Sequence, residues 1–233
     1  MNILLTNDDG IEAEGINALY SALIDEHAVF IVAPERERSG CSNAITVRDS
    51  IRVEKLGERR FAVNGFTADC VNIGLHSDLV PGVDLVVSGI NHGPNLGTDV
   101  LYSGTVAAAH EAALLGYPAV AVSGLSYKGE HMDTAARVAA FAVEYVRRHP
   151  LAFGSVLNVN VPAVPFEALK GVKVAPLAVE QYALEYVERE DPFGRKYYWS
   201  PRGCTTCSDG MDVDDRWARE GYVTLTPITY DLT

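Results

Sequence analysis

The chain has 233 residues, of which 48% are hydrophobic and 21% are charged, a balance typical of a globular protein with a sizeable core. This composition excludes an intrinsically disordered chain. Acidic residues outnumber basic ones by 31 to 19, which gives a formal net charge of −12 and a pI near 4.9. So negative a surface repels polyanions, and neither a nucleic-acid duplex nor an anionic membrane is expected as the main partner. A phosphate ligand would need a metal ion or a helix N-terminus to attract it.

The first residues run from an apolar stretch straight into Asp8 and Asp9, which is not the pattern of a secretory signal. No uninterrupted apolar run reaches about 18 residues, so we expect no membrane span. Four cysteines in 233 residues do not make a disulfide framework. We therefore expect a cytoplasmic protein.

Short apolar runs alternate with helical patterns through the first two thirds of the chain. Buried strands are predicted at 3–5, 29–33, 83–87, 119–122 and 156–161. Helices are predicted at 16–24, 68–79, 104–115 and 133–148. Residues 45–63 alternate in polarity, which is typical of a hairpin or of edge strands. The repeated strand–helix order predicts an α/β fold, with a mostly parallel sheet flanked by helices on both faces.

The pattern changes after about residue 162. Alternating segments at 172–174, 196–199 and 222–228 are separated by glycine and proline, and no clear long helix follows. We expect an α/β core over 1–161 that carries the active site. The remainder, 162–233, is expected to be a β-hairpin-rich extension of the same compact unit, serving as an arm for oligomerisation.

Polar residues gather where three of the predicted parallel strands end. They occupy 7–10, 34–43 and 88–99, and a fourth polar stretch at 102–105 opens the next helix. Ligands bind beyond the carboxyl ends of the strands in open parallel sheets. We therefore expect these segments to meet at one edge of the sheet and to form the site.

Asp8 and Asp9 are adjacent carboxylates that repel each other at a strand end, and a divalent cation such as Mg²⁺ or Mn²⁺ would relieve this repulsion. The alternative is an Asx turn with a helix N-cap, but the neighbouring loops favour the metal. Ser39 and Asn91 offer further neutral oxygens, although each alone is typical of a loop. His92 could act as a ligand or general acid; without a second histidine at metal spacing we interpret it as a loop residue.

Ser103, Gly104 and Thr105 open a predicted helix, whose free N–H groups and dipole favour an anion. An ordinary Ser/Thr N-cap explains the same residues. Neither a Walker A motif nor a Gly-x-Ser-x-Gly elbow is present in the sequence. Cys204 and Cys207 have the spacing of a redox pair or half a zinc site, but no second pair exists, and we expect a structural or incidental role.

Together these segments resemble the SurE family of survival proteins. The resemblance rests on Asn-Asp-Asp-Gly at 7–10, Arg-Ser-Gly at 38–40, Ser-Gly-Ile-Asn-His-Gly-Pro-Asn-Leu-Gly at 88–97 and Tyr-Ser-Gly-Thr-Val at 102–106. Weaker matches lie at 65–71, 158–162 and 221–227, so the resemblance covers nearly the whole chain.

The resemblance implies a Rossmann-like fold with an extended β-hairpin arm, assembled as a homodimer or homotetramer. One divalent metal, Mg²⁺ or Mn²⁺, is expected on Asp8, Asp9, Ser39 and Asn91. The phosphate of the substrate is expected at Asn43, Asn95, Ser103, Gly104 and Thr105.

The activity implied is a metal-dependent 5′-nucleotidase, a phosphomonoesterase that converts nucleoside 5′- and 3′-monophosphates to nucleoside and phosphate. Asp8 and Asp9 are the expected catalytic residues. Water would attack phosphorus, activated by the metal or by one of these carboxylates; direct attack by an aspartate is less favoured, because the usual Asp-x-Asp spacing is absent. The alternatives are a nucleotide-binding sensor without turnover, or a broad-specificity phosphatase or exopolyphosphatase.

Overall fold

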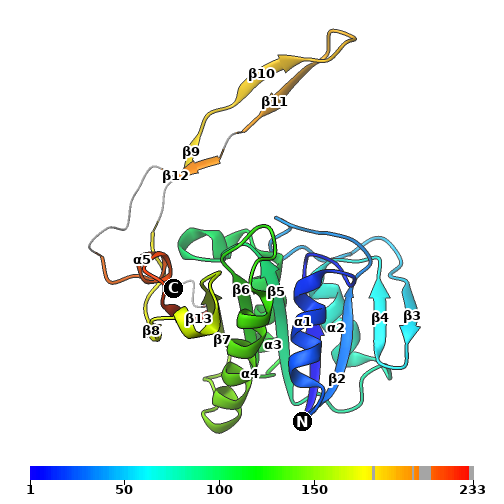
Figure 1. The fold of residues 1–233 in the computed structure, drawn as a ribbon. Coiled ribbons are helices and arrows are strands. Elements are labelled where there is room, and N and C mark those ends of the chain that lie inside the picture. Colours follow the sequence, from blue (N-terminus) through cyan, green and yellow to red (C-terminus); the bar gives the residue numbers. More distant parts are fainter. Residues whose placement is uncertain (180–181, 201, 205–210, 231–233) are drawn as a thin grey trace.

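One mixed sheet of nine strands forms the centre of the molecule (Figure 1). The computed structural model describes residues 1–179, 182–200, 202–204 and 211–230. The strands lie in the order β3-β4-β2-β1-β5-β6-β7-β13-β8. Their bounds are β1 (Asn2–Thr6), β2 (Ala28–Pro34), β3 (Val53–Gly57), β4 (Arg60–Val63), β5 (Leu85–His92), β6 (Ala119–Gly124), β7 (Ser155–Val161), β8 (Val172–Val174) and β13 (Val223–Thr229). The six strands from β4 to β7 in this order run parallel, so their carboxyl ends share one edge.

Two pairs of helices cover the two faces of this sheet. On one face α1 (Glu14–Leu23) packs beside α4 (Met132–Arg148), and on the other α2 (Thr67–His76) packs beside α3 (Gly104–Leu114). Shorter elements are the 3₁₀ helices η1 (Gly97–Leu101) and η2 (Phe166–Ala168) and the helix α5 (Asp214–Arg219). The predicted α/β architecture is confirmed.

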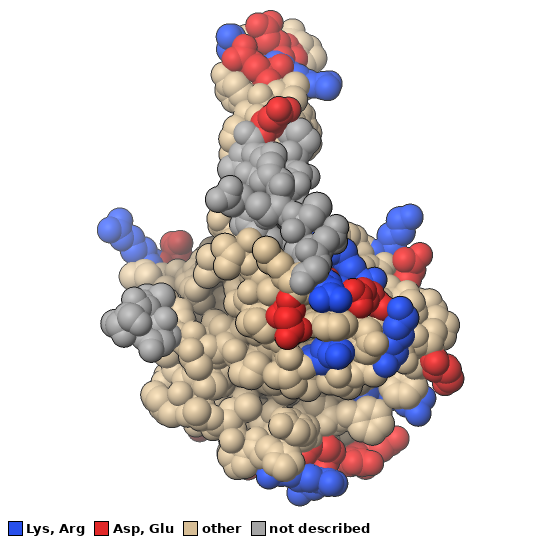
Figure 2. All heavy atoms as spheres, turned by 90° about the vertical axis from the view of Figure 1, so that its left-hand side faces the viewer, with Lys and Arg blue, Asp and Glu red and all other residues tan. Residues whose placement is uncertain are grey.

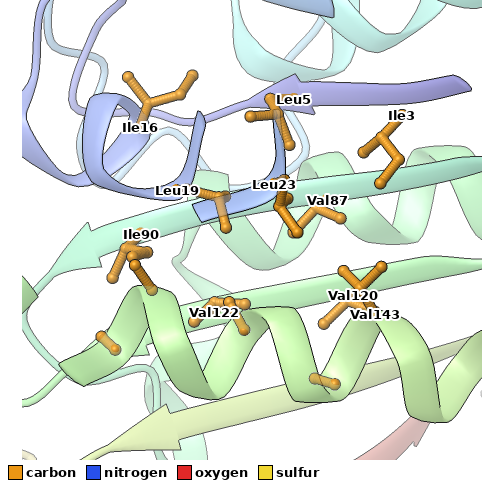
Figure 3. Packing of buried hydrophobic residues seen from close by; sticks show 14 of the residues in the cluster. Ile3, Leu5, Ile16, Leu19, Leu23, Val87, Ile90, Val120, Val122 and Val143 are labelled. Carbon is orange, nitrogen blue, oxygen red and sulfur yellow. The ribbon is translucent and has the colours of Figure 1, made fainter. Parts of the chain in front are cut away.

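The periodicity of the sequence explains how the helices attach. Ile16, Leu19 and Leu23 lie on one face of α1, where they pack against Leu5 and Ile90 of the sheet (Figure 3). On the opposite face the buried surface of α3 is mostly alanine, which lets the helix lie close to the strands. Each face of the sheet thus has its own apolar core.

The structure departs from the sequence prediction in three places. Residues 45–51 do not form a strand, and Ile45 and Val47 are exposed in a loop. Within the predicted extension, β13 and β8 join the main sheet, where β13 pairs antiparallel with β7. The helix α5 was not predicted, because six residues are too few to reveal a helical period.

A long arm rises from the body (Figure 1). Its outer part is the antiparallel pair β10 (Val187–Glu190) and β11 (Lys196–Trp199), and its base is the antiparallel pair β9 (Tyr182–Leu184) and β12 (Arg202–Cys204). Charged side chains of both signs gather at its tip (Figure 2). Cys207 lies outside the described residues, so the expectation for Cys204 and Cys207 stays a prediction. No helix in the described part of the chain is both long and apolar enough to cross a membrane.

Candidate active site

A cleft of about 620 Å³ opens where the parallel strands end. Six of the residues that the sequence singled out line it: Asp8, Asp9, Ser39, Asn91, Asn95 and Ser103. The remaining three do not: Asn43 is exposed outside the cleft, while Gly104 and Thr105 are buried beneath it. Strands β1, β2 and β5 and the start of α3 therefore converge on one site, as the spacing predicted.

Asp8 lies directly after β1 and is 3% exposed. Its carboxylate accepts a hydrogen bond from the Thr105 hydroxyl, at the first turn of α3. Gly104 is required at this point, because a methyl group there would lie 2.9 Å from Oδ2 of Asp8 and 2.8 Å from Sγ of Cys41. The start of α3 thus packs directly onto the Asp8 carboxyl.

Burial raises the pKa of Asp8 from 3.8 to about 6. The hydrogen bond from Thr105 partly opposes this rise, and the neighbouring charge of Asp9 adds to it. Burial also raises the pKa of Asp9, although His92 opposes that shift. Two carboxyls in which the charged form is disfavoured are suited to a site that a cation completes.

Asp9 is fixed by His92, at the end of β5. Oδ2 of Asp9 accepts the backbone N–H of His92 at 3.2 Å, and Oδ1 lies 3.5 Å from Nδ1 of the same residue. The Asp9 side chain keeps 11% of its surface exposed, toward the cleft that it lines. His92 therefore lines the cleft and contacts the predicted metal ligand Asp9. The sequence had suggested only a loop residue without a role in the site.

Two neutral oxygens complete the predicted ligand set. The Asn91 amide donates to the carbonyl oxygen of Gly93 at 2.8 Å, which turns its Oδ1 toward the Thr105 hydroxyl, 3.3 Å away. The Ser39 hydroxyl is exposed and donates to Glu37 at 2.8 Å. All four predicted ligands offer oxygen, which fits Mg²⁺ or Mn²⁺ better than a soft metal.

Asn95 is held by β7, which the sequence analysis did not assign to the site. Its backbone carbonyl accepts the amides of Asn158 and Asn160 at 2.9 and 3.0 Å, and its own amide donates to Ser123 at 2.8 Å. These buried hydrogen bonds fix the loop that follows β5. Asn158 and Asn160 are therefore supports for the cleft.

The start of α3 differs from the anion site that its sequence suggested. The Ser103 hydroxyl accepts the backbone N–H of Val106 at 3.1 Å, an ordinary N-cap. Thr105 is fully buried and its hydroxyl contacts Asp8. The anion that this helix start contacts in the structure is the Asp8 carboxylate, and binding of phosphate by Ser103, Gly104 and Thr105 stays a prediction.

Further residues line the cleft. Glu37, Asp99 and Tyr102 belong to the polar segments that were expected there, whereas Tyr127 and Lys128 belong to none of them. Tyr127 and Lys128 follow β6, the next parallel strand after β5. Their position beyond the carboxyl end of a parallel strand is the sequence signal that marks them as cleft residues.

A separate acidic group lies away from the cleft, on α4 and at the end of α1. Glu26, His27 and Glu144 offer ligand atoms within 4.8 Å of one another. Glu144, however, is engaged by Arg147 at 2.8 Å. None of the three lines the cleft, so they do not belong to the predicted metal site.

The fold and the cleft define a class: an α/β protein whose mostly parallel sheet presents two adjacent carboxylates and further side-chain oxygens at its carboxyl edge. The family model described as "Survival protein SurE" matches residues 3–184. The chain belongs to the SurE family, as its motifs suggested.

Relatives match over the full chain. "5'-nucleotidase SurE" of Idiomarina loihiensis is 44% identical over 233 residues, covering all of this chain and 93% of the relative. "5'/3'-nucleotidase SurE" of Citrobacter koseri is 44% identical over 234 residues, covering all of this chain and 92% of the relative. The crystal structure of the SurE protein from Aquifex aeolicus superposes with a TM-score of 0.89 at 36% identity, covering all of this chain and 95% of that one.

Proposed function

We propose that this protein is a divalent-metal-dependent 5′-nucleotidase that hydrolyses nucleoside 5′- and 3′-monophosphates. The observation that carries this proposal is the pair Asp8 and Asp9 at the end of β1. Asp8 is buried, Asp9 is half-buried, and both line a cleft large enough for a nucleotide. The names of the relatives support the same activity.

Asp8, Asp9, Asn91 and Ser39 would hold one Mg²⁺ or Mn²⁺ ion. When bound, the ion would neutralise charge on the phosphoryl oxygens and make water a better nucleophile. The chain's own groups would position the reactants. Thr105 and His92 fix the two carboxylates. Asn95 lines the cleft and is held there by the side chains of Asn158 and Asn160 on β7.

The hydrolytic step is attack by water on phosphorus, with release of the nucleoside oxygen. The water loses a proton to solvent or to a carboxylate of the Asp8–Asp9 pair, and the nucleoside oxygen takes up a proton as its bond to phosphorus breaks. Ser103 and Asn95 line the cleft within reach of a bound substrate, and we assign them to the phosphate side.

The test is release of inorganic phosphate from adenosine 5′-monophosphate and adenosine 3′-monophosphate. The protein should release phosphate with Mn²⁺ or Mg²⁺, lose this activity in EDTA, and regain it when metal is returned. Binding of the nucleotide without phosphate release in any metal would indicate the sensor instead. Full activity after metal removal would contradict the metal's role.

We propose further that residues 162–233 serve for homo-oligomerisation, as a dimer or tetramer. The arm exposes large apolar side chains, with Phe193 83% exposed and Trp199 65% exposed. Light scattering on the full chain should give at least twice the monomer mass of 25.2 kDa. A variant without residues 187–199 should give a smaller assembly.

A cytoplasmic location is part of the same proposal. Cys41 and Cys70, the cysteines whose side chains the structure describes, are both free thiols. Free thiols are typical of a reducing compartment.

A further inference from the structure

We infer that the loop between β6 and α4, residues 125–131, is the element that recognises the nucleotide, with Tyr127 as the stacking surface for the base and Lys128 as a counter-charge for the phosphate. This inference rests on the proposed nucleotidase function. It adds Tyr127 and Lys128 as specificity-determining residues. Both follow the end of β6, outside the motifs described above.

The loop is ordered by hydrogen bonds around Ser126, which is 6% exposed. The Ser126 hydroxyl accepts the backbone N–H of Lys128 at 3.1 Å and donates to the Glu130 carboxylate at 3.0 Å. Farther along, Gly129 packs over His92, since a methyl group at Gly129 would lie 3.4 Å from Nε2 of the imidazole. The loop is therefore a fixed wall of the cleft, already in contact with a residue that positions Asp9.

Tyr127 presents its ring at the rim of the cleft. One side of the ring packs on Gly93, where a methyl group would come within 2.4 Å of Cε1, and Gly93 has a φ of +109° that favours glycine. The residue is nevertheless 78% exposed. An aromatic ring that lines a cleft and is largely exposed to solvent is suited to stacking with a nucleobase, because every base offers a π face.

Lys128 supplies the charge that the cleft otherwise lacks. Among the described residues that line it, Asp8, Asp9, Glu37 and Asp99 are acidic, and Lys128 is the only lysine or arginine. Such a cleft repels a phosphate dianion until the negative charge is balanced. A metal ion would balance part of it, and Lys128, which follows β6, supplies a further positive charge at the cleft.

The experiment measures KM and kcat for adenosine 5′-monophosphate and for glycerol 1-phosphate, which has no base, in the Mn²⁺-loaded protein. Tyr127→Ala should raise KM for the nucleotide roughly 10-fold with kcat little changed, and leave glycerol 1-phosphate unaffected. Tyr127→Phe should restore the wild-type KM. The matched control is Phe153→Ala, which removes an aromatic residue 81% exposed outside the cleft.

Lys128→Ala should raise KM for both substrates about 3- to 10-fold, and the difference from wild type should shrink as salt is added. Lys128→Arg should return KM most of the way to the wild-type value. Lys55→Ala, which removes an exposed lysine on β3, should leave KM unchanged. Equal loss on both substrates for Tyr127→Ala, or no loss in either alanine variant, would overturn the inference. No phosphate release by the wild-type protein from either substrate would overturn the proposed function and this inference with it.

Discussion

The Thr105 hydroxyl donates a hydrogen bond to Oδ1 of Asp8, a residue 97 positions earlier in the chain. This contact joins the first turn of α3 to the end of β1, and it stabilises the charged form of a carboxyl whose burial favours the neutral form. We therefore predict that Thr105 positions Asp8; its direct contact with phosphate, which the resemblance implied, stays a prediction as well.

Thr105→Ala should weaken Mn²⁺ binding roughly 10- to 100-fold, because loss of a hydrogen bond to a buried carboxylate raises the pKa of Asp8 and releases its orientation. Thr105→Ser should keep most of the affinity, since it retains the hydroxyl. Titration calorimetry of the metal at fixed pH checks both variants. If Thr105→Ala binds Mn²⁺ as tightly as the wild type does, Thr105 does not position the metal ligand Asp8. A direct contact between Thr105 and the phosphate would then be the favoured role.

Asp9→Asn should reduce both Mn²⁺ affinity and turnover, the latter by roughly 10²- to 10³-fold or more, because the charge that faces the cation is removed. Calorimetry and phosphate release measure the two effects separately. Asp25→Asn, which changes an exposed aspartate at the end of α1, is the control and should alter neither. Wild-type metal affinity in Asp9→Asn would remove Asp9 from the ligand set.

The metal-free protein should lose stability as pH rises from about 4 to about 7. The folded-state pKa of Asp8 is raised from 3.8 to about 6, so the folded state binds the proton more tightly than the unfolded state between these values. The free energy of unfolding therefore falls with rising pH, by about 3 kcal/mol from this group once the pH exceeds 6. The raised pKa of Asp9 acts in the same direction.

Urea unfolding of the metal-free wild type and of Asp8→Asn at several pH values isolates this effect. The variant should be less stable than or similar to the wild type near pH 4 and more stable near pH 7, because it carries no charge to bury. Saturating Mn²⁺ should stabilise the wild type more as pH rises, since metal and proton compete for the same carboxylates. A difference between the two proteins that does not change with pH would contradict the burial of a charged Asp8.

Asp214→Asn should destabilise the protein by about 2 kcal/mol and raise KM for the nucleotide. Asp214 is fully buried, and its two oxygens accept the backbone N–H groups of Gly97 at 2.9 Å and of Ala178 at 2.8 Å. An asparagine would place an N–H donor against one of these donors. Because Gly97 follows Asn95 closely, the same change should loosen the cleft. Urea unfolding and steady-state kinetics measure both, again with Asp25→Asn as the control.

The parallel core and most of the cleft could be predicted from the sequence. Strand and helix periods are local properties, so β1, α1 and β5 lie close to where the pattern predicted them. The carboxyl ends of parallel strands share one edge, and this rule alone brought Asp8, Asp9, Ser39 and Asn91 to one cleft. Asp8 and Asp9 stood out as adjacent carboxylates at a strand end, whereas Ser39 and Asn91, each typical of a loop, were singled out by the resemblance.

The contacts of individual side chains, in contrast, depend on how distant segments pack together. The residues around a helix start do not show whether it binds a phosphate or a carboxylate of the same chain. Thr105 contacts Asp8 because α3 packs against the end of β1. The sequence pattern places Asn158 and Asn160 inside a strand. Their hydrogen bonds to the Asn95 carbonyl depend on how β7 packs beside the loop after β5. Likewise β13 enters the main sheet next to β7 after a long intervening arm, a pairing that no short-range period encodes, since sheet partners are chosen by the burial of apolar faces distant in sequence.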